Sequence, residues 1–393
     1  MAIDRHAPSL PQGRAGQAPR RSRRFRAGLT PSSPRDSRIS FPQTGARMEP
    51  IRTIHVGLGA WGSNWATSVL AGHPEVDVLA YVDRDSATVV RMQQRLGLPP
   101  EKFFPSLEAA MAAVDAEAVI VALPIALHAP VAWQALEAGK HVVVEKPFTE
   151  NLQEARDLVA LAEARGLVLA VSQNYRFYPA PQMAAQLTRG AYLGRLASVN
   201  VDFRRNAFAE RSSNLKIPHP LLRDMAIHHY DLMRLVIGED PVEVSARTWN
   251  PPGSPYEMHP AGAMVFSFPS GVHVSYRGSW VDFGPQTPWG GDWKMDFEKG
   301  SITWTSRGDQ PWPMKRDTVQ IRRPNATMEE VALPEMRFHD RAGTLAAFAQ
   351  AIRTGTEPPH FPSGRNNIMT LAIAEAALQS SLNGGAPVRL DSL

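Results

Sequence analysis

Three side chains of this sequence have the chemistry and the surroundings needed to move a proton. Lys146 follows the apolar run Val142–Val144 and Glu145, and Pro147 after it restrains its backbone to an extended conformation. Ligands of open α/β sheets bind at the carboxyl ends of parallel strands, so we expect Lys146 to point into a crevice there. A lysine in that place can donate to a substrate hydroxyl and stabilise a developing alkoxide. The competing interpretation is a surface lysine at the end of a strand.

Asp224 and His228 are four residues apart, which places both on one face of the predicted helix Leu221–Ile237. The aspartate can fix the tautomer of the imidazole while the histidine removes the proton of an alcohol. Asp231 could orient the imidazole in the same way. His229 points about 100° away around the helix and is expected to be a polar support. A histidine with a structural role is the alternative.

A glycine turn near the start of the predicted fold has the pattern of a dinucleotide-binding site. Gly57, Gly59 and Gly62 follow the apolar run Ile51–Val56 and open a predicted helix. The first glycine permits a tight turn, the second lets the backbone approach a pyrophosphate, and the third lets the helix pack closely on the strand. The N–H groups of the turn and the helix dipole would then hold the phosphates.

The next apolar run ends at a residue that bears on the choice of nicotinamide cofactor. Asp83 stands there and can accept hydrogen bonds from the diol of an adenosine ribose, which favours NAD. Arg84 beside it could instead receive a 2′-phosphate, which leaves NADP open. A glycine turn without any ligand is the alternative.

Strands and helices alternate up to residue 172, and this alternation predicts an α/β fold with a parallel, doubly wound sheet and right-handed crossovers. The predicted strands are Ile51–Val56, Val76–Val82, Ala118–Leu123, Val142–Val144 and Leu167–Ser172, and the helices are Trp61–Ala71, Ala87–Leu96, Pro130–Ala138 and Leu152–Arg165. After Asn174 the signals are mainly strands and turns, which predicts an α+β domain with a largely antiparallel open sheet. Its predicted strands are Val242–Trp249, Ala261–Ser267, Val272–Trp280, Trp293–Phe297, Ser301–Thr305 and Thr318–Arg322, and its helices are Pro181–Arg189, Leu221–Ile237, Gly343–Thr354 and Asn366–Asn383.

Four segments together resemble the glucose–fructose oxidoreductase / inositol dehydrogenase / rhizopine-catabolism (Gfo/Idh/MocA) family over residues 50–390. They are the glycine turn, Leu123–His128, Glu145-Lys146-Pro147 and Leu222–Asp231. The resemblance implies a Rossmann domain over residues 49–172 and a substrate-binding and oligomerisation domain over residues 173–393. It also implies that Lys146, Asp224 and His228 are the catalytic residues. Ala226 stands where many members have glycine, which bears on close packing at the cofactor.

The resemblance and the motifs together give two sets of binding residues. The expected cofactor contacts are Gly57, Gly59, Ala60, Trp61, Gly62, Asp83, Arg84, Pro124, His128, Glu145, Lys146 and Asn174. The expected substrate contacts are Lys146, Tyr175, Arg176, Asp224, His228 and Trp289. For Arg176 an ion pair between the domains is an equal alternative, and for Trp289 ordinary core packing is one.

The resemblance therefore implies an NAD(P)-dependent oxidoreductase that transfers a hydride between a nicotinamide and a polyol, a sugar or a sugar-derived substrate. Two alternatives stay open: a lyase or hydrolase that uses NAD in a redox cycle, and a sensor that binds the dinucleotide without turnover. A homodimer or homotetramer is implied by the family. Histidines elsewhere lack the spacing of metal ligands, so we expect no metal site.

Charge is distributed unevenly along the chain. Residues 1–48 contain ten Arg and two Asp, a net charge of +8, so the remaining residues have a net charge of −4. This tail is expected to be disordered. Three interpretations compete: a targeting segment, a nucleic-acid arm, or translation from a start codon upstream of the true one. Met48 favours the third. We expect no nucleic-acid partner, no membrane-spanning segment and a cytoplasmic location. The absence of Cys excludes disulfides and thiol nucleophiles.

Overall fold

The computed structural model describes residues 49–206, 215–308 and 317–393. The expectations for the tail 1–48 lie outside the described residues. Within the described parts of the chain, no helix is long and apolar enough to cross a membrane.

The first sheet has six strands in the order β3-β2-β1-β4-β5-β6, and all of its neighbouring pairs are parallel. This is the doubly wound order with its switch point between β1 and β4, and it confirms the predicted fold class. The strands are β1 (Ile51–Val56), β2 (Val76–Val82), β3 (Phe103–Phe104), β4 (Ala118–Val121), β5 (His141–Val144) and β6 (Leu169–Val171). The crossovers carry α1 (Ala60–Trp65) with a π-helical continuation (Ala66–Leu70), α2 (Ser86–Leu96), α3 (Leu107–Ala113), α4 (His128–Glu137) and α5 (Leu152–Ala164).

Alternate residues of each central strand pack on opposite faces of this sheet. In β4, Ala118 and Ile120 belong to the apolar cluster that contains Trp65 of α1. Val119 and Val121 belong instead to a cluster with residues of α3, α4 and α5. A strand buried on both faces reads as a continuous apolar run, which is why these strands could be found in the sequence.

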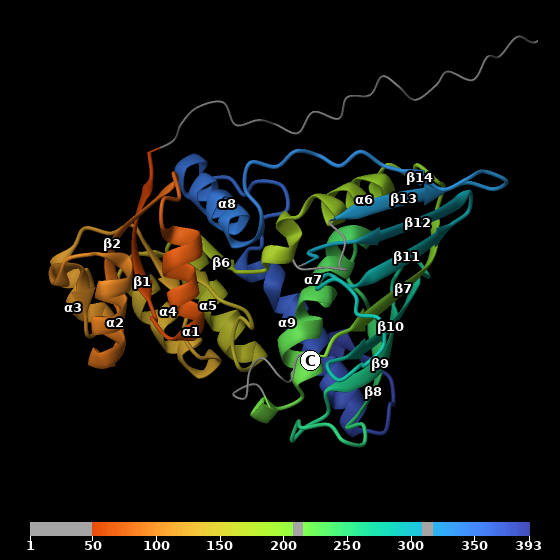
Figure 1. Cartoon of the computed structure of the whole chain (residues 1–393), viewed down its shortest axis with the longest axis horizontal. Coiled ribbons are helices and arrows are strands. Elements are labelled where there is room, and N and C mark those ends of the chain that lie inside the picture. Colours follow the sequence, from red (N-terminus) through yellow and green to blue (C-terminus); the bar gives the residue numbers. More distant parts are fainter. Residues whose placement is uncertain (1–48, 207–214, 309–316) are drawn as a thin grey trace, which may run out of the picture. The chain divides into compact units, whose positions relative to one another are not determined.

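The second sheet has nine strands in the order β14-β13-β12-β11-β7-β10-β9-β8-β15. Neighbouring strands are antiparallel except for β7 and β10, which confirms a largely antiparallel sheet. The strands are β7 (Leu196–Arg204), β8 (Glu243–Trp249), β9 (Ala261–Ser267), β10 (His273–Ser279), β11 (Asp292–Phe297), β12 (Gly300–Thr305), β13 (Thr318–Arg322), β14 (Glu329–Glu330) and β15 (Val388–Arg389). Helices α6 (Pro179–Arg189), α7 (Ala226–Ile237) and α9 (Gly364–Leu382) pack beside it (Figure 1).

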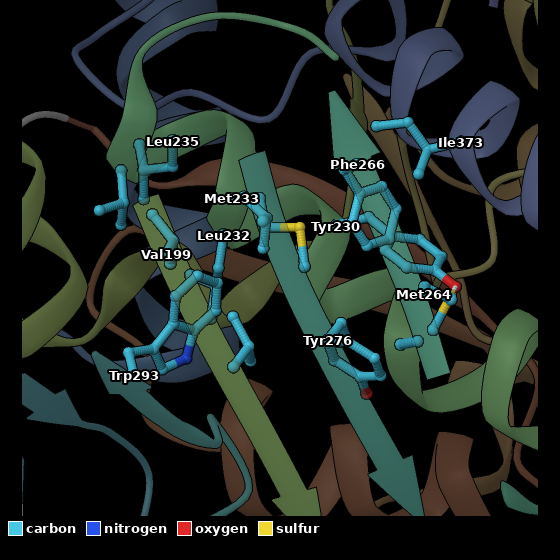
Figure 2. Close-up of a cluster of buried hydrophobic side chains, with 14 of the residues drawn as sticks. Val199, Tyr230, Leu232, Met233, Leu235, Met264, Phe266, Tyr276, Trp293 and Ile373 are labelled. Carbon is cyan, nitrogen blue, oxygen red and sulfur yellow. Dashed lines mark hydrogen bonds between the residues drawn. The ribbon is translucent and has the colours of Figure 1, made fainter. Parts of the chain in front are cut away.

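Helix α7 is the central element of the second core. Tyr230 and Met233 of this helix pack with Phe266 of β9 and Tyr276 of β10 in one buried cluster (Figure 2). The same cluster contains Ile373 of α9, so the helix has apolar neighbours from both the sheet and another helix. A helix enclosed in this way is held in a fixed position, which matters because His228 lies in its first turn.

Helix α8 (Asp340–Thr354) lies late in the sequence but packs with the first sheet. Its residues Leu345 and Phe348 are fully buried in the cluster that contains Ile51 and Trp65. Its Arg353 also pairs with Glu117, with Nη1 and Oε1 2.5 Å apart. The hydrogen bonds from Arg353 lower the pKa of that carboxyl to about 2. The first core is therefore completed by a helix that lies far beyond the predicted domain boundary at residue 172.

Two buried histidines predict how stability depends on pH. Burial lowers the pKa of His55 and of His229 to about 4 in each case. Below pH 6.5 the unfolded chain takes up these protons and the folded chain does not, until the pH approaches 4. The free energy of unfolding should therefore fall by about 1.4 kcal/mol per pH unit for each histidine across that window. Urea unfolding at pH 7, 6 and 5 measures this, and equal stability at all three values would contradict it.

Candidate active site

The carboxyl end of β5 and the chain just before α7 face each other across one cavity. Lys146 and Asp224 both line this cavity of about 580 Å³, called here the lysine cavity. Lys146 Nζ lies 2.7 Å from Asp224 Oδ1 and 3.0 Å from the Asp224 carbonyl oxygen. The lysine therefore points into the crevice, as its position after a parallel strand predicted.

The chain around Asp224 is a π-helical turn, Leu221–Met225, and not the first turn of a regular α-helix. The N–H of Ala226 donates to the carbonyl of Leu221, five residues earlier. His228 Nδ1 has no hydrogen-bond partner among the described residues, so the predicted bond from the imidazole to Asp224 is not formed. The expectation that Asp224 orients the imidazole is therefore wrong for this structure: its carboxylate is bonded to Lys146. Turns of this kind occur often at functional sites.

His228 lies against Tyr175 at the wall of the lysine cavity. The two rings are stacked with centroids 4.0 Å apart and an interplanar angle of 6°. Burial, followed by the charges of Lys146 and Arg307, lowers the pKa of His228 well below its usual value. Its Nδ1 is buried and has no hydrogen-bond partner among the described residues. His228 is thus a neutral imidazole, able to accept a proton, at the edge of a cavity lined by cations.

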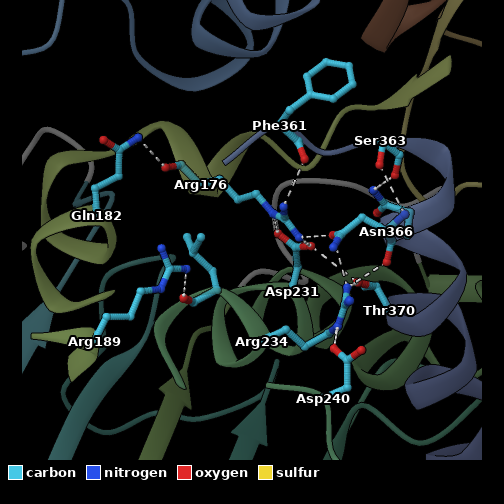
Figure 3. Close-up of polar contacts among 12 residues, drawn as sticks. Arg176, Gln182, Arg189, Asp231, Arg234, Asp240, Phe361, Ser363, Asn366 and Thr370 are labelled. Carbon is cyan, nitrogen blue, oxygen red and sulfur yellow. Dashed lines mark hydrogen bonds and ion pairs between the residues drawn. The ribbon is translucent and has the colours of Figure 1, made fainter. Parts of the chain in front are cut away.

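Asp231 and Arg176 form a buried ion pair away from the lysine cavity (Figure 3). Arg176 Nε and Nη2 each lie 2.5 Å from one oxygen of the Asp231 carboxylate, and the side chains are 5% and 1% exposed. Arg176 also donates to Asn366 Oδ1. Two expectations are therefore corrected: Asp231 does not orient His228, and Arg176 pairs with a carboxylate of its own predicted domain, neither with a substrate nor across the domain boundary.

His229 has the supporting role that its position on the helix predicted. Its Nδ1 lies 2.9 Å from the Tyr276 hydroxyl, and its Nε2 lies 3.0 Å from the carbonyl oxygen of Trp289. Trp289 itself lines the lysine cavity, and the guanidinium of Arg205 lies 3.9 Å from the centroid of its ring. The histidine thus holds the backbone of a cavity residue in place.

The glycine turn lines a second cavity of about 560 Å³ at the switch point of the first sheet, called here the glycine-turn cavity. The predicted cofactor residues that line it are Gly57, Gly59, Ala60, Trp61, Gly62, Asp83, Arg84 and Pro124. Asp83 Oδ2 accepts a hydrogen bond from the N–H of Leu58 at 2.8 Å, so the carboxylate also fixes the turn. Trp61 lines both cavities, which places the two side by side.

The turn fits a dinucleotide by its close contacts and its open space. A Cβ on Gly62 would lie 2.0 Å from the Gly57 carbonyl oxygen, whereas one on Gly59 would meet nothing within 4 Å. Gly59 therefore faces open space where a pyrophosphate can approach, and Gly62 stands where helix and strand touch. The first N–H groups of a helix have no intrahelical partner, and the first-turn residues Ala60, Trp61 and Gly62 of α1 line this cavity, so their N–H groups are candidate donors to a phosphate.

These contacts predict opposite results for two glycine variants. Gly62→Ala should disrupt the turn, lowering both the melting temperature and NAD affinity, because backbone atoms occupy the space of the new methyl group. Gly59→Ala should keep the melting temperature of the wild type and lose affinity for NAD only. Differential scanning calorimetry and a fluorescence titration with NAD measure the two properties. Equal melting temperatures for both variants would contradict the packing role of Gly62.

Two predicted cofactor residues have structural contacts that the sequence did not suggest. Glu145 accepts hydrogen bonds from the Trp65 indole at 2.8 Å and from the Lys146 backbone N–H at 3.0 Å, whereas the Lys146 ammonium is bonded to Asp224. Its side chain still lines the lysine cavity. The ring nitrogens of His128 each lie 2.8 Å from a backbone carbonyl oxygen, those of Pro147 and Leu123. His128 therefore holds two loops together, and it is absent from the lining of both cavities within the described parts of the chain.

The lysine cavity brings together most of the remaining predicted residues and adds others. Asn174, Tyr175, His228 and Trp289 line it as expected, and the amide of Asn174 donates to Asp340. The polar and aromatic lining residues that were not predicted are Asn64, Tyr256, Trp280, Arg307 and Arg341. The density of tryptophans after residue 280 was one available signal, but neither arginine belongs to a recognisable motif. Among the described residues, no group of three or more His, Asp or Glu side chains could hold a metal ion.

Comparisons with known proteins agree with this architecture. Residues 51–173 match the family model of the Gfo/Idh/MocA oxidoreductases with an NAD-binding Rossmann fold, and residues 182–303 match a C-terminal domain model of the same family. The chain is 26% identical over 338 residues to a dTDP-3,4-didehydro-2,6-dideoxy-α-D-glucose 3-reductase of Streptomyces violaceoruber, covering 84% of this chain and 94% of the relative. It is 38% identical over 147 residues to a UDP-N-acetylglucosamine 3-dehydrogenase of Acidithiobacillus ferrooxidans, covering 36% and 42%.

A solved structure shares the fold along nearly its whole length. It is an inositol dehydrogenase homolog complexed with NAD⁺ from Azotobacter vinelandii. The TM-score is 0.74 at 19% sequence identity, covering 87% of this chain and 97% of that chain. At this identity the likeness concerns the arrangement of the two sheets and their helices.

Proposed function

This chain belongs to the Gfo/Idh/MocA family of NAD-binding oxidoreductases, and we propose that it interconverts an alcohol and a carbonyl group on a sugar, a polyol or a sugar-derived substrate. One observation carries the proposal. A lysine, a carboxylate and a neutral histidine meet in a cavity that shares Trp61 with the glycine-turn cavity. The names of the two relatives support a sugar substrate, since both denote redox chemistry at C3 of a sugar carried on a nucleotide.

The described contacts support a role for each of the three residues. NAD, when bound at the glycine turn, supplies the acceptor for the hydride of the alcohol carbon. His228 takes the hydroxyl proton, because its imidazole is neutral and lines the same cavity. The Lys146 ammonium donates to the alcohol oxygen and stabilises its developing negative charge. Asp224 holds the ammonium in place through the 2.7 Å contact, and is therefore a positioning residue.

The proposal names NAD as the preferred cofactor. Asp83 directly follows β2 and lines the glycine-turn cavity, where its carboxylate can accept hydrogen bonds from a ribose diol and would repel a 2′-phosphate. Arg84 lines the same cavity and is exposed, so NADP is the second candidate. The homodimer or homotetramer implied by the family stays a prediction.

Absorbance of the reduced nicotinamide tests this function. The protein is supplied with NAD or NADP and with a panel of sugars, polyols and their oxidised derivatives. Reduction of NAD by at least one member of the panel, faster than that of NADP, is the expected result. Cofactor binding without net reduction, together with elimination or hydrolysis of a sugar, would favour the redox-cycling alternative. Cofactor binding without any turnover would favour a sensor.

A further inference from the structure

Among the described residues that line the lysine cavity, cationic side chains outnumber carboxylates. Lys146, Arg307 and Arg341 line it, and the carboxylates that line it are Glu145 and Asp224. Asp224 is bonded to Lys146, and Glu145 accepts from the Trp65 indole and a backbone N–H. Neither carboxylate is thus hydrogen-bonded to an arginine.

Arg341 is the lining cation that has a hydrogen-bond donor without a partner among the described residues. It lies in the first turn of α8 and is only 7% exposed. Its guanidinium lies 4.5 Å from the centroid of the Trp61 ring, and its Nη2 donates to Asn64 Oδ1 at 2.5 Å. Its Nη1 is buried and has no hydrogen-bond partner among the described residues. A buried donor without an acceptor costs free energy, and a charged one costs more, so such atoms in a cavity wall point to a ligand.

We propose that Arg341 binds a carboxylate of the substrate, so that the protein acts on a sugar acid such as an aldonate or a uronate; this inference rests on the proposed function. Two oxygens of a carboxylate match the planar guanidinium, and a charge-assisted hydrogen bond satisfies Nη1. The alcohol of the same molecule then lies at Lys146 and His228, which line the same cavity.

The position of Arg341 favours the substrate over the cofactor as the source of the anion. Arg341 lines the lysine cavity and is absent from the described lining of the glycine-turn cavity, whose turn residues would hold the pyrophosphate of a dinucleotide. The lysine cavity, at about 580 Å³, must also admit the nicotinamide ring. The space that remains suits a monosaccharide acid better than a sugar attached to a nucleotide.

The first test compares matched substrates on the full chain with NAD. Glucuronate is paired with glucose, gluconate with sorbitol, and glucose 6-phosphate is a third arm. We expect kcat/KM to be about 10- to 100-fold higher for the carboxylates, and Arg341→Gln to remove most of that preference. Arg341→Lys keeps the charge but not the planar guanidinium, and should retain part of the preference for carboxylates. Arg195→Gln, an exposed arginine outside both cavities, is the control with the same change of charge.

The second test measures binding without turnover, so that a failed proposal can be identified. Calorimetry with L-tartrate, a small hydroxy acid, should show binding to the wild type and a loss of about tenfold or more in affinity for Arg341→Gln. Arginine-dependent tartrate binding without turnover of any alcohol would support the inference and overturn the proposed function. Turnover of neutral sugars with no preference for carboxylates would do the reverse. A preference for glucose 6-phosphate, or loss of NAD affinity alone in Arg341→Gln, would overturn the inference.

Discussion

Replacing Lys146 by alanine should lower turnover by about 10²- to 10⁴-fold, the usual contribution of a positioned acid or base. The reason is that no other ammonium lines the described lysine cavity, and Asp224 is bonded to the one that does. NAD affinity should persist, because the glycine-turn cavity does not contain the lysine side chain. Steady-state kinetics with the best substrate of the panel and a separate NAD titration measure the two properties.

The chain offers a matched control on the same strand. Lys140 directly precedes β5 and Lys146 follows Glu145 at its other end, but Lys140 Nζ donates to the carbonyl of Ala116 outside the cavity. Lys140→Ala should therefore turn over substrate like the wild type. If Lys146→Ala does so as well, Lys146 has no part in the mechanism. Asp224→Ala should impair the same step, and the double variant should be little worse than Lys146→Ala, because the two groups act as a unit.

Replacing Asp231 by alanine should destabilise the protein by about 3–5 kcal/mol. The substitution leaves the Arg176 guanidinium, whose side chain is 5% exposed, without its carboxylate in the interior. Asn366 still accepts from it, but a neutral amide does not replace a bidentate charged partner. Urea denaturation followed by circular dichroism gives the free energy of unfolding of each variant.

Two further variants distinguish the destabilisation caused by an unpaired buried charge from the net contribution of the ion pair to stability. The double variant Arg176→Met/Asp231→Leu should recover most of the lost stability, since apolar groups of similar volume often replace a buried pair without cost. Asp296→Ala breaks a pair with Lys294 whose side chains are 58% and 38% exposed, and should cost less than about 1 kcal/mol. An Asp231→Ala protein as stable as Asp296→Ala would contradict the importance of the buried pair.

The first domain could be predicted from the sequence because its signals are local. Strand, glycine turn, helix and acid follow one another within one segment, and buried parallel strands read as apolar runs. The short elements β3 and α3 were not predicted. Strand β7 was also missed, although its sequence Leu196–Arg204 alternates in burial as a strand with one covered face does.

The site could be predicted only in part, because its remaining features depend on tertiary structure. Spacing placed Asp224 and His228 together on a regular helix, and it could not show that a π-helical turn would direct the carboxylate to Lys146. The partner of Arg176 lies 55 residues away along the chain. Arg341 lies 277 residues from Asn64, to which it donates. No local pattern encodes contacts of that range.

The position of α8 has a consequence for how this protein is made. On the ribosome, residues 49–172 emerge long before Leu345 and Phe348, which cover Ile51 and Trp65 in the finished core. At a synthesis rate of about 5–20 residues per second, these residues of α8 are made roughly 10–30 s after residue 172. During this interval one face of the first sheet exposes apolar surface that a chaperone can bind. The nucleotide-binding half is therefore completed only after α8 has been synthesised.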